Sequence, residues 1–202
     1  MFIRRFIQLQ LGLCLYGVSL ALLVRADLGL DPWDVFHQGL SEKTGLSLGS
    51  ILIIVGAAVM LLWIPLRQRP GIGTISNIFV IGLVADLALY LMPPLQHLAV
   101  QGLALFAGVM LNAVASAAYI GAGMGPGPRD GLMTGLARRT GWPLRWTRMG
   151  IEGTVLALGW LLGGSVGLGT VVYAVAIGPL IQLMLPWFEI APKREVIPAA
   201  TT

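Results

Sequence analysis

Charged residues are scarce in this chain of 202 residues, where Asp, Glu, Lys and Arg together make up 11%. Soluble domains carry about 25% charged residues, so this composition excludes an ordinary water-soluble domain. Hydrophobic residues make up 56% of the chain, and its mean hydropathy is +0.84. We therefore expect an all-α integral membrane protein whose main partner is the lipid bilayer.

Metal-binding and redox-active side chains are equally rare. Cys14 is the only cysteine, which excludes an intramolecular disulfide, and His37 and His97 are too few to build a zinc site. The basic residues lie between apolar runs and form no basic run of their own, so nucleic acid is not an expected partner. Because metalloprotease, P-loop and haem motifs are also absent, we expect no enzyme activity, no metal and no cofactor.

An internal repeat with an offset of 96 residues is the most informative feature that is present. Residues 11–89 align with residues 107–185 without a gap, and 23 of the 79 pairs are identical. Transporters built from two related halves place their sites at the Gly/Pro-interrupted segment of each half. We expect two repeats, residues 1–96 and 97–189, followed by a cytoplasmic tail over residues 190–202.

Six segments are long and apolar enough to predict membrane spans, three in each repeat. They cover residues 6–24, 50–66, 74–92, 99–120, 149–164 and 170–188. The first resembles a signal peptide, but its residues recur in the fourth segment, which favours a retained span.

The positions of lysine and arginine predict the orientation of these spans. With both termini in the cytoplasm, 11 of the 13 basic residues lie on the cytoplasmic side and only Arg25 and Lys43 lie outside. Three spans per repeat is an odd number, so the second repeat is expected to be inverted relative to the first.

Two shorter segments between the spans predict helices of about 13 residues each. Pro32 and Pro128 stand at first helical positions, and Gly45 and Gly141 suit the C-terminal caps, so helices are expected over 32–44 and 128–140. About 20 Å of helix is too short to cross a bilayer. These segments are therefore either re-entrant half-helices or amphipathic helices at the interface.

Two acidic residues lie in the first turns of these short helices. Asp34 and Asp130 are repeat partners, and carboxylates there can accept backbone N–H bonds and complement the helix dipole. That capping role is one interpretation. The other is that both face a polar cavity between the repeats and bind a cation, a proton or an amine, since carboxylates at membrane depth are costly.

The residues that precede these acids differ between the repeats. Arg129 takes the place of Trp33, so we expect two chemically unequal half-sites. The inner one suits an anion, and the outer one suits a cation stacked on an aromatic ring.

Two further acids lie within the predicted spans. Glu152 shares a helix face with Arg148, four residues earlier, and the two can pair. Asp86 has Gln182 as its repeat partner, which indicates either an interhelical hydrogen bond or a polar pathway. The expected substrate-binding residues are thus Asp34, Asp130, Arg129, Glu152, Asp86 and Trp33.

Glycine–threonine motifs precede the third and sixth spans. Gly71-x-Gly73-Thr74 and Gly167-x-Gly169-Thr170 predict tight turns followed by threonine N-caps. The expected structural motif residues are Gly29, Pro32, Gly125, Pro128, Gly73, Thr74, Gly169, Thr170 and Arg148.

Three of these stretches carry a family resemblance. Residues 26–34 (ADLGLDPWD), 44–49 (TGLSLG) and 123–133 (GMGPGPRDGLM) resemble the YczE/YyaS/YitT family of bacterial membrane proteins. The resemblance covers nearly the whole chain up to Glu189. It implies a bacterial inner-membrane protein and implies no mechanism.

We expect a small secondary transporter or solute-binding membrane protein, with its site between the two short helices. Its partner would be an unknown small solute or ion. The alternative is a non-transporting membrane scaffold or subunit that supports an enzyme or export system. A homodimer or another protein partner is compatible with the glycine-rich spans.

Overall fold

The computed structural model describes residues 1–190, and all regular structure there is helical. The helices are α1 (Phe2–Ala26), α2 (Pro32–Thr44), α3 (Leu48–Trp63), α4 (Ile72–Leu91), α5 (Leu98–Gly121), α6 (Pro128–Thr140), α7 (Leu144–Leu161) and α8 (Leu168–Phe188). The bounds of α1 to α4, moved by 96 residues, match those of α5 to α8 to within two residues. The sequence repeat is therefore also a repeat of helices. All but the first residue of the expected tail lies outside the described residues.

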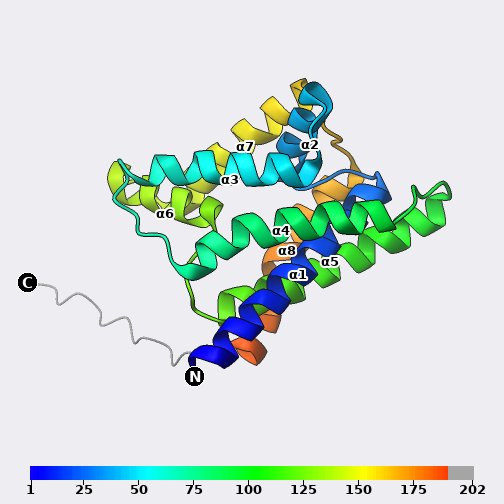
Figure 1. The fold of residues 1–202 in the computed structure, drawn as a ribbon. Coiled ribbons are helices and arrows are strands. Elements are labelled where there is room, and N and C mark those ends of the chain that lie inside the picture. The colour runs from blue at the N-terminus through cyan, green and yellow to red at the C-terminus, as the bar shows by residue number, and fades with distance from the viewer. Residues whose placement is uncertain (191–202) are drawn as a thin grey trace, which may run out of the picture.

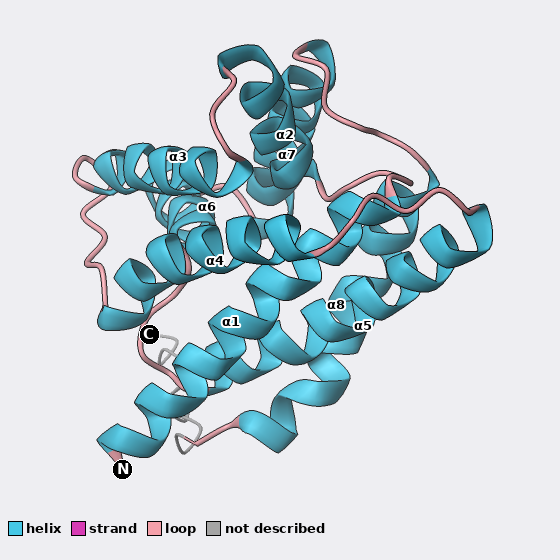
Figure 2. Ribbon diagram, turned by 45° about the vertical axis from the view of Figure 1, so that its right-hand side comes forward, coloured by secondary structure: helices cyan, strands magenta, loops and turns pink. Residues whose placement is uncertain are grey.

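The helices form two layers, and the long ones make up the first (Figures 1 and 2). In this layer α1 packs along α5, α4 packs on α1, and α8 packs on α5. In the other layer α2 packs on α7 and α3 packs on α6, while α3 also contacts α4 of the first layer. Each layer thus contains two helices from each repeat.

The centre of the first layer is an antiparallel crossing of α1 and α5. A Cβ atom on Gly12 would lie 2.9 Å from the Tyr119 nitrogen, and one on Gly108 would lie 2.8 Å from Leu23 Cδ2. Gly12 and Gly108 are repeat partners, so each repeat contributes one glycine to the close approach. Small residues at such contacts let helix backbones pack closely, which is the main source of helix association in membranes.

The two short helices have the predicted bounds, Pro32–Thr44 and Pro128–Thr140. Each begins with its proline and ends at a glycine in the left-handed conformation, with φ of 71° at Gly45 and 74° at Gly141. The capping interpretation of Asp34 is wrong. Asp31 is the N-cap of α2, and its Oδ1 accepts the Asp34 N–H at 2.8 Å.

Four helices are long and apolar enough to cross a membrane, namely α1, α4, α5 and α8. A fifth crossing is possible if α2 and α3, which meet at a bend of 115°, act as one broken span. The sequence predicted six spans. The difference arises because α3 has only 16 residues, about 24 Å of helix, and because the first half of α7 carries Arg145, Arg148 and Glu152.

The glycine–threonine motifs correct a second prediction. Thr74 and Thr170 are the third residues of α4 and α8, and the N-caps are Gly71 and Gly167. Each threonine hydroxyl accepts the N–H of its N-cap glycine, at 3.1 Å in α4 and 3.3 Å in α8. Each N-cap therefore lies three residues earlier than expected. Glycine has no side chain to accept a hydrogen bond, so the hydroxyl of the third helical residue satisfies the first turn in its place.

These motifs also connect the two repeats. Gly73 N–H donates to the Met124 carbonyl at 2.9 Å, and Gly169 N–H donates to the Leu28 carbonyl at 2.6 Å. Each bond is the repeat image of the other. The segment before each short helix is thus held by the first turn of a long helix from the other repeat.

Candidate functional site

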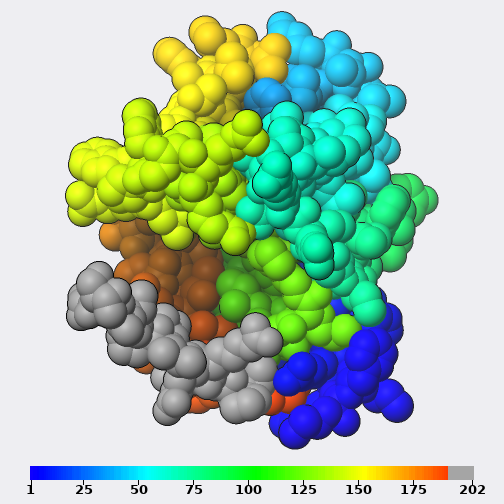
Figure 3. All heavy atoms as spheres, turned by 90° about the vertical axis from the view of Figure 1, so that its left-hand side faces the viewer, coloured from blue at the N-terminus to red at the C-terminus, as the bar shows by residue number. Residues whose placement is uncertain are grey.

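A cavity of about 380 Å³ lies between the two layers, and all eight helices contribute to its wall. Figure 3 shows the surface hollowed between the two layers on the side where α6 lies above α5 and α8. Much of the wall is aliphatic, from α3, α4 and α8. The charged and hydrogen-bonding side chains include Tyr16, Asp31, Trp33, Asn77, Tyr119, Arg129, Asp130, Arg148, Glu152, Tyr173 and Gln182.

Arg129 joins the first turns of the two short helices. Its Nη2 donates to Asp34 Oδ1 at 2.8 Å, and its Nη1 lies 3.5 Å from Asp31 Oδ2. The Asp34 and Asp31 side chains are 3% and 6% exposed, so both carboxylates are buried. Without the guanidinium group their negative charges would be uncompensated inside the protein.

Trp33 completes the environment of Arg129. The Arg129 guanidinium carbon lies 5.3 Å from the centroid of the Trp33 ring, within the range of a cation–π contact. The two residues are repeat partners, and they touch each other where two separate half-sites were expected. The cation stacked on the aromatic ring is therefore the protein's own arginine. The buried indole Nε1 of Trp33 has no hydrogen-bond partner within residues 1–190.

His37 extends the same group of side chains on α2. Its Nδ1 lies 3.1 Å from Asp34 Oδ1 and 3.4 Å from Arg129 Nη2. Asp31, Asp34 and His37 follow one another at intervals of three residues, which places all three on one side of the helix. The sequence motifs alone predict no role for Asp31 or His37, although their spacing from Asp34 would have indicated a shared helix face.

Asp130 is the carboxylate with the least compensation. Tyr119 Oη donates to its Oδ2 at 3.3 Å, and no Lys, Arg or His of residues 1–190 forms an ion pair with it. The residue is exposed, and its carboxyl group opens to the cavity. Burial raises its pKa, against the lowering effects of the Tyr119 hydrogen bond and of Arg129.

Asp31 also has a perturbed ionisation. Its pKa is raised to about 6, first by burial and then by the neighbouring Asp34 carboxylate, against the lowering effect of Arg129. For Arg129, burial lowers the pKa, but Asp34 and Asp31 outweigh that effect and raise it. The arginine is therefore a permanent cation, whereas Asp31 can change its charge near neutral pH.

The Arg148–Glu152 pair forms as the spacing predicted. Arg148 Nε donates to Glu152 Oε1 at 2.8 Å, and both side chains line the cavity from α7. The Arg148 and Glu152 side chains are 59% and 29% exposed. A pair this accessible to water contributes little to stability, so its position on the cavity wall is the more informative property.

Asp86 lies outside this cavity. Its Oδ1 accepts the Gly49 N–H at 2.7 Å and its Oδ2 accepts the Ser47 hydroxyl at 2.5 Å, which ties the start of α3 to α4. Its repeat partner, Gln182, does line the cavity. Polar groups at these matched positions therefore have different surroundings in the two repeats.

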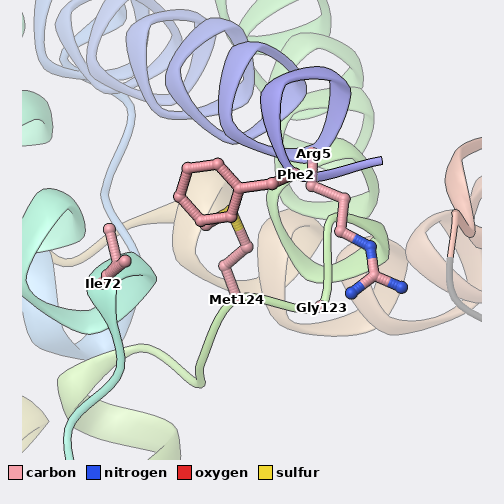
Figure 4. Close-up of a pocket in the computed structure, with 5 residues that line it drawn as sticks. All are labelled: Phe2, Arg5, Ile72, Gly123 and Met124. Atoms are coloured by element: carbon pink, nitrogen blue, oxygen red, sulfur yellow. The ribbon is translucent and has the colours of Figure 1, made fainter.

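A second hollow, of about 370 Å³, lies beside the N-terminal end of α1 (Figure 4). Phe2 and Arg5 of α1, Ile72 of α4, and Gly123 and Met124 line it. The guanidinium group of Arg5 points away from the Phe2 ring. With no carboxylate and only one charged side chain, this hollow offers far less chemistry than the cavity between the layers.

Metal binding has little support in either place. Within residues 1–190, no cluster of three or more His, Cys, Asp or Glu side chains could hold a metal ion. The cavity instead combines carboxylates, guanidinium groups and aromatic rings, a set that suits an organic solute.

Comparison with known proteins places the chain among bacterial membrane proteins. Residues 3–186 match a family described as "Family of unknown function (DUF6198)". An uncharacterised protein of Haemophilus influenzae is 37% identical, over 88% of this chain and 81% of its own length. The uncharacterised membrane protein YczE of Bacillus subtilis is 36% identical, over 85% and 80%, and YyaS of the same species is 23% identical, over 92% and 94%. No solved structure matches.

Proposed function

The chain belongs to the family of unknown function DUF6198, the YczE/YyaS family that its motifs resemble, and on this premise we propose that it is a small secondary transporter of the bacterial inner membrane. Its two repeats are inverted relative to each other, and both termini lie in the cytoplasm. Each repeat crosses the membrane three times, with the shorter helices α3 and α7 completing the crossings that α1, α4, α5 and α8 make by their length and apolar character. The short helices α2 and α6 are re-entrant, and they enter from opposite faces. The solute site is the cavity between the layers.

One observation carries this proposal. The cavity lies where the first turns of α2 and α6 meet, and it places Trp33, Arg129, Asp130 and Glu152 around one space. Charged groups at membrane depth are costly, so their gathering around a cavity favours a solute pathway over a purely structural role. The antiparallel crossing of α1 and α5 supports the inverted arrangement.

A difference between the repeats supports alternating access. In the first repeat α3 packs on α4, and a Cβ atom on Gly82 would lie 2.7 Å from the Gly49 carbonyl oxygen. In the second repeat Gly178, the partner of Gly82, has nothing within 4 Å, and the cavity separates α7 from α8. Exchanging the two arrangements would close the α7–α8 side and open the α3–α4 side. The same site would then face the opposite side of the membrane.

Paired cysteines can test this exchange in a Cys14→Ser background. A Cβ atom on Gly56 would lie 3.6 Å from Ile78 Cβ, which is within the range for a disulfide, so Gly56→Cys/Ile78→Cys reports the present state. Met149→Cys/Gly178→Cys reports the opposite state. The repeat partners of these two residues touch in the present state, where a Cβ atom on Gly82 would lie 2.9 Å from Ile53 Cγ1. Gly153→Cys/Gly178→Cys is the matched control, because the repeat partner of Gly153, Ala57, is exposed on α3.

A transporter should form both reporter disulfides in membranes, while the control pair stays reduced. Combining the four reporter cysteines in one chain should make the two disulfides mutually exclusive, because each locks one state. If only the Gly56/Ile78 pair forms, the protein is static, and the scaffold or partner-subunit alternative replaces the transporter. Because no solute is added, the result does not depend on knowing the substrate.

A further inference from the structure

The charges of the site do not balance. It contains the four carboxylates of Asp31, Asp34, Asp130 and Glu152 but only the two guanidinium groups of Arg129 and Arg148. Arg129 is held by Asp34 at 2.8 Å, and Arg148 is held by Glu152 at 2.8 Å. The excess negative charge therefore belongs to Asp130 and, in part, to Asp31.

Asp130 is the acid best placed to receive a ligand. Its one side-chain partner is the Tyr119 hydroxyl at 3.3 Å, and the Gly127 backbone also contributes a hydrogen bond, so the carboxylate keeps open acceptor positions for a ligand. The cavity gives a solute access to it, whereas Asp34 lies behind the cavity wall and is 2% exposed. Arg129 and Arg148 act on Asp130 only from beyond ion-pair distance, so a positively charged group beside it would supply the ion pair that residues 1–190 do not.

The rest of the wall is aromatic and aliphatic. Tyr16, Tyr119 and Tyr173 bring three rings to the cavity, and cations are attracted to the faces of aromatic rings. Isoleucine, leucine and valine side chains of α3, α4 and α8 also line the cavity. A volume of about 380 Å³ lies at the small end of the range for ligand sites.

We propose that the solute of this site is a small organic monocation, an amine or quaternary ammonium compound with an apolar body, whose charged nitrogen contacts Asp130. The apolar body lies along the aliphatic wall, away from the Arg129 group. This inference rests on the proposed transport function and names its substrate class.

Other solute classes fit the same surroundings less well. A small anion would have to share Arg129 with Asp34 or Arg148 with Glu152, and it would add charge to a site that is already negative. A divalent metal lacks a ligand cluster within residues 1–190. A neutral solute would gain no attraction from the Asp130 carboxylate.

Three ligands of similar shape and different charge provide the test. Benzyltrimethylammonium, benzyl alcohol and benzoate are titrated by calorimetry into the purified full-length protein in detergent, with Asp130→Asn and Glu42→Gln as variants. Glu42 is exposed on the last turn of α2 and serves as the matched carboxylate control. Benzyltrimethylammonium should bind wild type at least about tenfold more tightly than benzyl alcohol, and benzoate should bind most weakly.

The variants then locate the cation. Asp130→Asn should weaken benzyltrimethylammonium binding by between about tenfold and a hundredfold, whereas Glu42→Gln should leave it unchanged. The inference is overturned if benzoate or benzyl alcohol binds as tightly as the cation, if nothing binds, or if Asp130→Asn has no effect. If Asp130→Asn does not fold, the order of the three ligands on wild type still decides. Failure here with mutually exclusive disulfides would reject the substrate class and retain the transporter.

Discussion

Replacing Arg129 by glutamine tests how the two repeats are held together. The change removes the charge that lies 2.8 Å from Asp34 and 3.5 Å from Asp31 but keeps a polar side chain. Removing one partner of a buried ion pair costs about 3–5 kcal/mol, because the remaining charge stays buried and unpaired. Since the arginine side chain is itself 25% exposed, we expect the lower end of that range, about 3 kcal/mol.

Two companion variants separate this effect from the simple loss of an arginine. Arg148→Gln breaks the water-accessible pair with Glu152 and should cost no more than about 1 kcal/mol. Asp34→Asn/Arg129→Gln removes both charges of the buried pair. It should be about 2 kcal/mol more stable than the sum of the two single changes predicts.

Chemical unfolding in mixed micelles, followed by tryptophan fluorescence, gives these differences directly. Arg129 stacks on Trp33, so the emission spectrum also reports whether the local contact is lost. A stabilising role for the buried ion pair is refuted if Arg129→Gln costs no more than Arg148→Gln. It is also refuted if the double variant shows no coupling between Asp34 and Arg129, because the pair would then carry no net stabilisation.

Three further predictions follow from the same contacts. The raised pKa of Asp31, about 6 against an ordinary value near 4, means that the native chain holds a proton which the unfolded chain releases. Stability should therefore fall as pH rises from about 4 through 6, and Asp31→Asn, measured by unfolding temperature against pH, should flatten that slope. Gly159→Ala places a Cβ atom 2.4 Å from the main chain of α2 and should cost about 1–3 kcal/mol. Gly150→Ala, on the same helix with nothing within 4 Å, should be neutral or stabilising in the same unfolding assay. Thr74→Val should reduce the free energy of unfolding by about 1–3 kcal/mol, because the Thr74 hydroxyl also donates to the Pro126 carbonyl of the other repeat. Thr170→Val should cause a smaller loss in the same unfolding assay, because the Thr170 hydroxyl makes no such bond within residues 1–190.

The parts of the fold that sequence predicts best are those fixed by neighbouring residues. Pro32 and Gly45 bound α2 because proline at the first position and glycine in the left-handed conformation act within one turn. Hydropathy places the start of α4 at residue 74, two residues late, because it detects the apolar run and not a glycine N-cap supported by Thr74. Hydropathy predicts six spans, whereas only four helices are long and apolar enough by themselves, because α3 has 16 residues and α7 carries three charged residues in its first half.

The site can likewise be predicted where neighbouring residues determine it and cannot where distant residues do. Residue type and repeat position drew attention to Trp33, Asp34, Arg129 and Asp130, and Arg148–Glu152 followed from its spacing along one helix. Arg129 pairs with Asp34 and Asp31, which lie 95 and 98 positions away along the chain, and no local pattern predicts which acid a distant arginine will contact. The Tyr119 hydroxyl on Asp130 was missed for a different reason, since a tyrosine in an apolar span carries no sequence signal of its partner.

The contact between Trp33 and Arg129 explains why the repeats differ most where they meet. If a two-fold axis relates the repeats, as proposed, a residue near that axis faces its own repeat partner. Two arginines at this position would place like charges together beside the cavity, and two tryptophans would leave Asp31 and Asp34 without a counter-charge. An arginine on one side and an aromatic ring on the other satisfies both requirements at once. The difference between Trp33 and Arg129 is therefore a consequence of pairing the two repeats. It also places the positive charge on only one side of the shared cavity.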